Sequence, residues 1–305
     1  MRVVSLLPSA TETVCGLGVD PVGVTHECDY PPRVESIPTV VHSTIDTGGS
    51  SRAVDNRVQR SIERGGVYAL DHDRLRDLDP DVIVSQGLCD VCAVDEAVVR
   101  ETVADLGLDA DLVATHPHSL DDVLDDVERI GRAIGRESAA QRLIGDLRDR
   151  TDRIRERVDG TDTLTVTVLD WLDPVMVSGH WMPELVEIAG GEFRLAEPGE
   201  RSGPIEWQTL READPDVLVA APCGFSLDRT SESLPDLTAR EGWSELRAVR
   251  DGRAYMIDGN HYVNRPGPRL VDTLEHLAAV LHPERFDEPP AEVVRPIPRA
   301  REPPS

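Results

Sequence analysis

Three cysteines and a histidine stand in two short loops of the N-terminal part of the chain. His26 and Cys28 belong to the first loop, and Cys89 and Cys92 belong to the second. Each loop follows an apolar run that reads as a buried parallel strand. Loops at the carboxyl ends of parallel strands gather in one crevice, where ligands bind. Soft thiolate donors in such a crevice indicate a metal, a metal-containing ligand or redox chemistry.

The spacing of these four residues permits a metal site. The Cys-x-x-Cys pair Cys89 and Cys92 lets both sulfur atoms face one ion, and His26 and Cys28 would complete a tetrahedron suited to zinc. Two alternatives remain open. The pair can act as a thioredoxin-like redox motif, or the cysteines can fill the interior of the loops as small buried side chains. We favour a metal or ligand role, because three cysteines follow two strand ends of the same region.

The composition disfavours some classes of function. The chain has 305 residues, with 57 acidic residues, 32 basic residues and a net charge of −25. It contains no lysine, so arginine supplies all of its strongly basic side chains. The acidic residues are spread along the whole chain, which indicates a halophilic protein adapted to high salt. No basic patch is visible, so binding to double-stranded nucleic acid is not expected.

The first residues bear on where the protein works. The apolar run of residues 3–7 is shorter than the core of a signal peptide and is ended by Pro8. No later stretch approaches the roughly 20 apolar residues of a membrane span. We therefore expect a cytoplasmic protein with no membrane span. The five cysteines cannot all pair internally and would mostly be thiols in a reducing compartment.

The order of apolar runs predicts two α/β regions separated by a helical segment. Residues 1–118 alternate strands and helices, which is typical of βαβ units and a mostly parallel sheet. Residues 119–158 carry apolar side chains at helical spacing, with Ser119 as the expected N-cap. Strands return within residues 159–283. Residues 284–305 form a Pro-rich, charged tail that we expect to be extended or disordered.

Individual elements follow from the period of the apolar residues. The expected strands are residues 2–6, 22–25, 82–85, 112–114, 164–169, 217–219 and 255–257. The expected helices are a short one from residue 11, then residues 55–64, 75–78, 95–106, two helices within 119–158 separated at Gly135, and 269–281.

The two α/β regions resemble each other. Residues 75–84 and 210–219 share a short helix, an Asp-Pro-Asp turn and a buried strand in the same order. Residues 8–16 and 183–191 share a looser Pro-x-x-x-Glu-x-x-x-Gly pattern. This junction is common enough to recur by chance, but the length of the first match favours duplication. We therefore expect two similar lobes.

Several segments together resemble the family of iron-siderophore and cobalamin binding proteins associated with ABC importers, in particular a leaderless cobalamin-binding branch. They are residues 5–12, 23–25, 29–32, 78–83, 189–191 and 214–217. The resemblance covers roughly residues 1–283, and it rests on the order and spacing of these segments. It implies a class III solute-binding fold, in which two α/β lobes are joined by a long helix and the ligand lies in the cleft between them.

Aromatic and histidine side chains of the second region fit such a cleft. Trp171 follows a strand, and His180 and Trp181 precede a helix. Indole rings suit a large flat ligand such as a corrin or tetrapyrrole ring, and His180 can supply an axial nitrogen to cobalt or iron. The alternatives are that both indoles pack an interface between the lobes and that His180 is a surface histidine.

Other candidates depend on loop positions. Cys223 follows a repeated strand, either facing the cleft or serving as a structural thiol. Arg265 either holds a ligand carboxylate or phosphate or anchors its own loop. The resemblance implies that glutamates of each lobe dock onto an importer, but for Glu12 and Glu184 we favour helix N-terminal capping. The full set of expected ligand residues is Cys28, Tyr30, Cys89, Cys92, Trp171, His180, Trp181, Cys223 and Arg265.

These observations favour a monomeric, non-enzymatic protein that binds cobalamin, another corrinoid or a related metal-bearing cofactor, with an ABC importer as a possible partner. Three alternatives stand beside it. The first is a cytoplasmic protein that binds or delivers zinc or another transition metal through Cys and His ligands. The second is a thiol-dependent enzyme that processes corrinoids. The third is an importer subunit exported by an unrecognised route.

Overall fold

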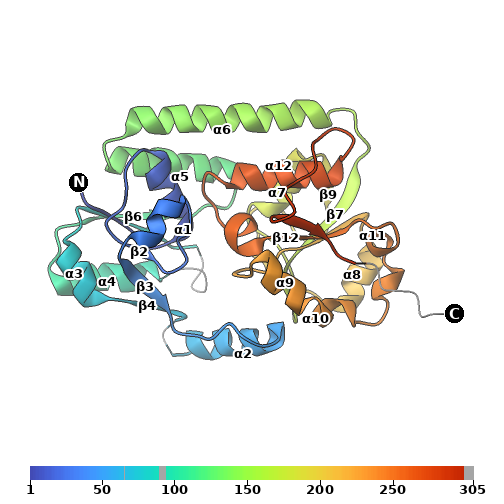
Figure 1. Cartoon of the computed structure of the whole chain (residues 1–305), viewed down its shortest axis with the longest axis horizontal. Helices are drawn as coiled ribbons and strands as arrows, with labels where there is room; N and C mark the ends of the chain where they lie inside the picture. The colour runs from blue at the N-terminus through green and yellow to red at the C-terminus, as the bar shows by residue number, and fades with distance from the viewer. Residues whose placement is uncertain (65, 89–93, 299–305) are drawn as a thin grey trace.

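The computed structural model describes residues 1–64, 66–88 and 94–298, and these form two α/β lobes lying side by side (Figure 1). Helix α6 (Glu137–Val158) runs along one side of both lobes, and helix α2 (Ser51–Ile62) lies along the opposite side. No helix in the described part of the chain combines the length and the hydrophobicity needed to cross a lipid bilayer. The expected α/β fold with two lobes and a helical connection is confirmed.

The N-terminal lobe contains two small sheets. A parallel sheet has the order β1 (Val3–Ser5), β5 (Val82–Gln86) and β6 (Asp111–Thr115). The second sheet has the order β2 (Val24–Thr25), β3 (Thr39–Ser43) and β4 (Tyr68–Leu70). The sequence did not predict β3 and β4. The segment at the start of β2 also lies beside β1, through an isolated parallel bridge between Val4 and Gly23, so it links the two sheets.

Short helices surround these sheets. They are α1 (Pro8–Gly16), the 3-10 helix η1 (Pro32–Ser36), α2, α3 (His72–Leu78) and α4 (Glu96–Leu106). Helix α2 lies in the chain between β3 and β4. Three of its apolar residues, Val54, Val58 and Ile62, recur every four residues, and Val54 is buried.

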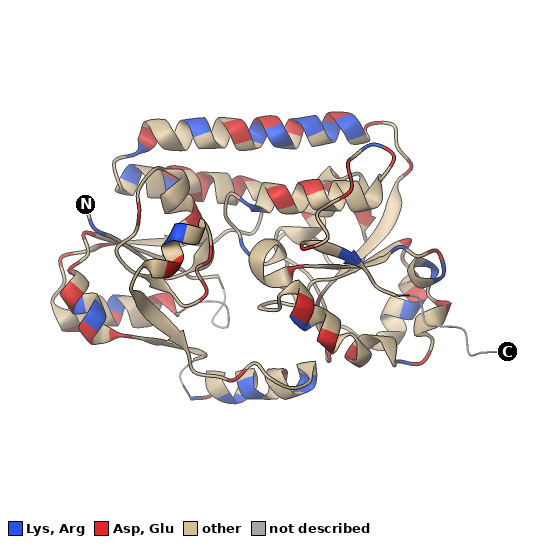
Figure 2. Cartoon of the chain, in the orientation of Figure 1, with Lys and Arg blue, Asp and Glu red and all other residues tan. Residues whose placement is uncertain are grey.

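The connection between the lobes consists of α5 (Leu120–Ala133) and α6 (Glu137–Val158). Ser119 caps α5 as predicted, because its side chain accepts from the backbone N–H of Asp122 and the Asp122 side chain accepts in return. Gly135 lies between the two helices with a φ of 64°, a conformation that glycine adopts without strain. The exposed face of α6 carries acidic and arginine side chains along its whole length (Figure 2).

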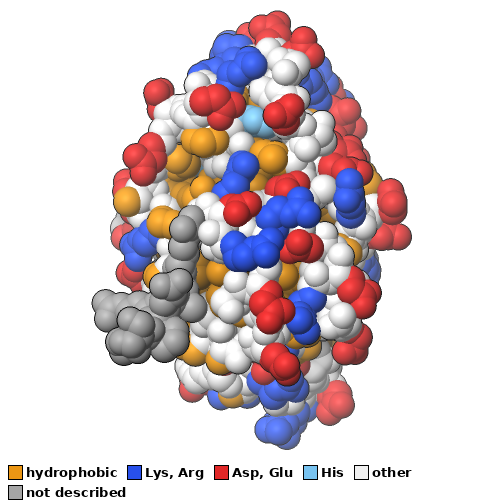
Figure 3. All heavy atoms as spheres, turned by 90° about the vertical axis from the view of Figure 1, so that its right-hand side faces the viewer, with side chains coloured by type: hydrophobic (Ala, Val, Ile, Leu, Met, Phe, Trp, Pro, Cys, Tyr) orange, Lys and Arg blue, Asp and Glu red, His pale blue; other side chains and the backbone are white. Residues whose placement is uncertain are grey.

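The C-terminal lobe is built on one mixed sheet with the order β10-β8-β7-β11-β12-β13, and β9 pairs with β7. Its strands are β7 (Leu164–Leu172), β8 (Val175–Val177), β9 (Gly191–Phe193), β10 (Gly203–Pro204), β11 (Val217–Ala220), β12 (Ala254–Ile257) and β13 (Val294–Pro296). Its helices are α7 (Met182–Ile188), α8 (Trp207–Ala213), α9 (Leu227–Ser233), α10 (Pro235–Thr238), η2 (Trp243–Glu245), α11 (Arg247–Arg250), η3 (Gly259–Val263) and α12 (Leu270–Leu281). Acidic and arginine side chains are interspersed on its outer face (Figure 3).

The internal repeat has a structural counterpart. Helix α3 ends at Asp79 and helix α8 ends at Asp214, and these residues have φ values of 41° and 39°. Each aspartate therefore adopts the left-handed conformation that few residues other than glycine tolerate. In both lobes the chain then enters a fully buried parallel strand, β5 or β11. The shared backbone conformation supports the interpretation that the lobes are duplicated.

The Pro-rich tail departs from the expectation of disorder over residues 284–298. Strand β13 pairs antiparallel with β12 and forms the edge of the C-terminal sheet. Val293, Val294 and Ile297 are buried there. The high content of proline and charged residues led to the prediction of disorder, but these three apolar residues are buried at the edge of the sheet.

Candidate functional site

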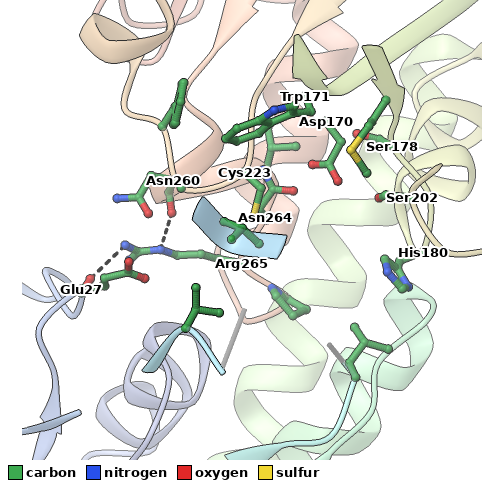
Figure 4. A pocket seen from close by; sticks show the side chains of 18 of the residues that line it. Glu27, Asp170, Trp171, Ser178, His180, Ser202, Cys223, Asn260, Asn264 and Arg265 are labelled. Atoms are coloured by element: carbon green, nitrogen blue, oxygen red, sulfur yellow. Dashed lines mark hydrogen bonds between the residues drawn. The ribbon is translucent and has the colours of Figure 1, made fainter. Parts of the chain in front are cut away.

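A cavity of about 410 Å³ lies between the lobes. This volume is typical of sites for small molecules. The N-terminal lobe supplies the start of α1, the segment around β3 and β4, one face of α2 and the end of β5. The C-terminal lobe supplies the ends of β7 and β11, the start of α7 and the loop before α12. Figure 4 shows labelled residues of both lobes pointing into it.

Aromatic rings form much of the wall from the C-terminal lobe. Trp171 packs against Phe225, with ring centroids 4.9 Å apart, and its indole N–H donates to the carbonyl of Asp173 at 3.2 Å. Trp181 is buried, and its indole N–H donates to the carbonyl of Val263 at 3.0 Å. Because both indole N–H groups have backbone partners, the rings are held in place and present apolar surface to the cavity.

His180 lies beside this wall in an unusual backbone conformation, with a φ of 53°. Its ring stacks on Trp181 and lies 5.6 Å from the ring of His118. Burial, together with the nearby His118 and Arg201, lowers the pKa of His180 to about 4. Its Nδ1 is buried and has no hydrogen-bond partner within residues 1–64, 66–88 and 94–298. A neutral imidazole of this kind can coordinate a metal.

A polar corner of the same lobe was not predicted from the sequence. It consists of Asp170 at the end of β7, Ser178 just after β8 and Ser202 just before β10, and all three line the cavity. Burial raises the pKa of Asp170, and a hydrogen bond from Ser202 offsets part of this effect, so that the pKa is about 6. In the sequence, the only indication of this polar corner was that Asp170 follows a run of β-branched residues.

Cys223 also lines the cavity from the loop after β11. Its backbone N–H donates to the carbonyl of Asp170 at 3.0 Å, and its thiol is half-buried and free. The expected position of Cys223 at the cleft therefore agrees with the geometry, although binding by its sulfur stays a prediction.

Helix α2 provides the opposite wall, which the sequence did not indicate. Val54, Asp55, Val58 and Gln59 face the cavity. The helix also contacts the C-terminal lobe through Arg52, whose Nε and Nη2 donate to the two carboxylate oxygens of Asp173 at 2.8 and 2.6 Å. The N–H of Ser51 donates to Asp236 at 2.7 Å. We call these two interactions the α2 contact.

Arg265 lines the cavity, but its guanidinium chiefly joins the two lobes. Its Nε donates to the carbonyl of Asn260 at 2.6 Å, and its Nη2 donates to the carbonyl of Glu27 at 3.1 Å (Figure 4). Its Nη1 lies 3.3 Å from Glu12 and also pairs with Asp29. With so many partners already in place, Arg265 has little capacity left for a ligand carboxylate or phosphate. The geometry favours the anchoring role.

Arg269 completes the same cluster. Its Nη2 donates to Glu12 at 2.7 Å, and its guanidinium lies 4.4 Å from the ring centroid of Tyr30. We call Glu12, Asp29, Arg265 and Arg269 the buried clamp. Burial raises the pKa of Glu12, and the two arginines offset only part of that effect.

Beside the clamp the backbones of the two lobes lie close together. A Cβ placed on Gly267 would lie 3.0 Å from the carbonyl oxygen of Ser9.

The roles expected for the two glutamates need correction. Glu12 lies in the middle of α1 and pairs with the clamp arginines, so it does not cap that helix. Glu184 does satisfy a helix N-terminus, but not its own. Its carboxylate accepts from the backbone N–H of Leu120, the first residue of α5, at 2.8 Å.

Three residues of the loop after β2 do not reach the cavity. Cys28 is buried in a small core with Cys15 and Val34, and its sulfur contacts the hydroxyls of Thr11 and Thr25. Tyr30 is 46% exposed beneath Arg269. His26 Nδ1 lies 3.0 Å from the carbonyl of Val41. The expectation that Cys28 and Tyr30 line the cleft is therefore wrong. Glu27 of the same loop does line the cavity, but Cys28 is taken up by the small core and Tyr30 lies at the surface.

The expected metal site receives no support from the part of the chain that is described. His26 and Cys28 belong to no cluster of three or more potential ligands there. Burial raises the pKa of the Cys28 thiol, which disfavours the thiolate that metal binding requires. Cys89 and Cys92 lie outside the described residues.

Comparison with known proteins places these features in context. The periplasmic binding protein family matches residues 3–260. A cobalamin-binding protein of Halobacterium salinarum is 27% identical over 289 residues, which are 92% of this chain and 69% of that protein. An uncharacterized ABC transporter substrate-binding lipoprotein of Bacillus subtilis, YvrC, is 24% identical over 297 residues, covering 94% of this chain and 82% of that protein.

Solved structures share the fold at low sequence identity. The periplasmic vitamin B12 binding protein BtuF of Vibrio cholerae has a TM-score of 0.68 and 19% identity, covering 92% of this chain and 96% of that one. A periplasmic heme binding protein of Pseudomonas aeruginosa has a TM-score of 0.70 and 20% identity, covering 97% and 95%.

These comparisons overturn the expected cytoplasmic location. The matched family is named for periplasmic binding proteins, and the Bacillus relative is a lipoprotein. The expectation rested on the first residues of the chain, whereas the family match covers most of its length. The comparisons likewise give no support to a cytoplasmic metal-delivery protein or a cytoplasmic thiol enzyme.

Proposed function

Because the chain belongs to the periplasmic binding protein family, we propose that it binds cobalamin or a related corrinoid between its lobes and presents it to an ABC importer. The family consists of solute-binding proteins and not of enzymes. The names of two relatives, a cobalamin-binding protein and an ABC transporter substrate-binding lipoprotein, support the ligand and the partner.

The observation that carries this proposal is the aromatic wall. Trp171 with Phe225, and Trp181 beside it, offer a broad apolar surface whose orientation is held by hydrogen bonds. A corrin ring is large and flat, and it would bury its apolar face against such a wall. The neutral imidazole of His180 lies at the edge of this surface and can approach a metal at the centre of the ring.

The size of the cavity limits how the ligand sits. A volume of about 410 Å³ encloses only part of a corrinoid, so we expect the rest of the ligand to project past α2. Binding then requires α2 to shift, and the α2 contact would change on loading.

The test is a titration of the purified protein with cyanocobalamin and aquocobalamin at high salt. We expect quenching of tryptophan fluorescence and, for aquocobalamin, a change in the corrin absorption if His180 replaces the bound water. Trp171→Ala should weaken binding about five- to tenfold, because one stacked aromatic is worth about 0.5–1.5 kcal/mol beyond the apolar area that it buries.

Trp207→Ala is the matched control. Trp207 belongs to α8 and is not among the residues that line the cavity, so its removal should leave the affinity within about twofold. The proposal fails if neither corrinoid quenches the fluorescence of the wild-type protein, or if both substitutions weaken binding equally.

A further inference from the structure

The polar corner of Asp170, Ser178 and Ser202 belongs to two paired strands and the segment beside them. The N–H of Ser178 donates to the carbonyl of Val168 at 2.9 Å, in continuation of the β7-β8 pairing. The β7-β8 register shifts between Leu169 and Trp171, so Asp170 stands at a β-bulge, where the regular alternation of side chains is broken, and it lines the cavity as Ser178 does. Figure 4 shows the three polar side chains together on one wall of the pocket.

The hydrogen bonds of the corner leave two atoms available. Ser202 Oγ accepts from the N–H of Gly179 at 3.0 Å, so its own hydrogen is directed to Asp170. Asp170 Oδ1 and Ser178 Oγ are both buried, and neither has a hydrogen-bond partner in the described ranges. A buried polar atom without a partner costs about 1–3 kcal/mol. Two such atoms on one wall of a cavity indicate that the ligand supplies the partners.

The charge around the corner restricts what that partner can be. No ion pair joins Asp170 to an arginine within residues 1–64, 66–88 and 94–298. Arg265, which lines the same cavity, is already paired with Glu12 and Asp29. Arg201 also lines the cavity, but its side chain is exposed and the neighbouring His180 is neutral. The corner therefore offers an acceptor and a hydroxyl, without a buried cation.

We propose that Asp170 and Ser178 form a subsite for a primary carboxamide, which selects corrinoids with amide side chains over tetrapyrroles with free carboxylates. A carboxamide presents an N–H donor next to a carbonyl acceptor. The N–H matches Asp170 Oδ1, and the carbonyl matches the hydroxyl hydrogen of Ser178. A carboxylate at the same place has no donor for Asp170 and adds a second negative charge.

This inference rests on the proposed function and deepens it, because it assigns a specificity to the cavity. Sites built to bond a polar group reject analogues that leave the site unpaired far more strongly than apolar pockets reject a change of size. Cobalamin carries several primary amides around its ring, whereas haem carries two carboxylates. The corner therefore distinguishes two ligands that the aromatic wall alone would treat alike.

The experiment compares cyanocobalamin with its monocarboxylic acids, in each of which one side-chain amide has been hydrolysed. Dissociation constants are measured at pH 7.5 from tryptophan quenching. The wild-type protein should bind cyanocobalamin about tenfold more tightly than at least one of these acids. Asp170→Asn and Ser178→Ala should each reduce this preference to about twofold or less.

Asp251→Asn is the matched control, since Asp251 is exposed on the C-terminal lobe and is not among the residues that line the cavity, and its replacement removes the same charge. It should leave the preference unchanged. Equal binding of all monoacids by the wild-type protein, or an unchanged preference in Asp170→Asn, overturns the subsite while the proposed function stands. No binding of cyanocobalamin by the folded wild-type protein overturns both. Thermal unfolding of each variant shows that a lost preference is not lost folding.

Discussion

Two of the contacts between the lobes use the same chemistry in different surroundings. In the buried clamp, Arg265 and Arg269 pair with Glu12 and Asp29. In the α2 contact, Arg52 pairs with Asp173. Both are arginine–carboxylate interactions between the lobes. The side chain of Arg265 is 4% exposed, whereas that of Arg52 is 63% exposed.

This difference in burial decides what each contact can do. A buried charge that loses its partner stays in a medium that solvates it poorly, so the clamp resists opening. An exposed ion pair that opens exchanges its partner for water and loses little. We infer that the clamp is a permanent joint between the lobes and that the α2 contact is the one that opens when a ligand enters.

The largest expected effect comes from breaking the clamp. Arg265→Met leaves Glu12 and Asp29 short of a partner, and it should lower the free energy of unfolding by about 3–5 kcal/mol. Chemical denaturation in a fixed salt concentration measures this value. The double variant Glu12→Gln, Arg265→Met should recover part of the loss, because it leaves one fewer buried charge unpaired. An equal or larger loss in the double variant would contradict this account.

A buried carboxylate with a weaker partner sharpens the comparison. Asp126 of α5 is buried and lies 3.1 Å from Arg129, which is half-exposed. Burial raises the pKa of Asp126 to about 7, because Arg129 offsets it only in part and Asp122 and Asp125 add to it. The folded protein therefore takes up a proton at this site, and stability should fall as the pH rises from about 4 to about 7.

Asp126→Asn removes this titration. Compared with the wild type, it should be about 1–3 kcal/mol more stable at pH 8 and equally stable near pH 4, since one pKa unit corresponds to about 1.4 kcal/mol. Unfolding curves at several pH values measure the difference. Asp125→Asn is the control, because that neighbouring side chain is exposed. The same pH profile in both variants would show that net charge, and not burial, is responsible.

The smallest effect on stability is expected at the α2 contact. Arg52→Ala should cost less than about 1 kcal/mol, since exposed pairs contribute little and Asp173 keeps its bond to Arg240. Release of bound cyanocobalamin should nevertheless be about two- to fivefold faster at low salt, and the difference should shrink at high salt. Stopped-flow fluorescence measures the rate. Arg60→Ala, an exposed arginine on the same helix, should change neither quantity.

Much of the framework could be predicted because its signals are local. The β-branched run before Asp170 indicated β7, and Ser119 with Asp122 indicated the start of α5. Residues 75–84 and 210–219 indicated the duplicated junction, because both segments show a short helix, a turn and a buried strand in the same order. Trp171, His180, Trp181, Cys223 and Arg265 were all predicted at the cleft and all line the cavity.

The remainder of the site depends on pairing between distant segments. Cys28 and Tyr30 were assigned to the cleft because their loop follows a strand beside β1, and that strand does bridge β1 through Val4 and Gly23. Only Glu27 of the three reaches the cavity, because Cys28 packs into a separate small core and Tyr30 lies at the surface. The helix over residues 55–64 was predicted, but its place at the cavity depends on β3 and β4, the two strands on either side of it, which the sequence did not indicate. Asp170 acquires its surroundings only through the β7-β8 pairing. The two arginines near residue 267 gave no sign that their partners lay more than 230 residues earlier.

The close approach of Gly267 to Ser9 has a mechanical consequence. Because the backbones meet there without an intervening side chain, we expect the lobes to move by rotation about that point rather than by sliding. Helix α2 lies at the outer side of the molecule (Figure 1). A small rotation about Gly267 would therefore move α2 further than any segment close to Gly267.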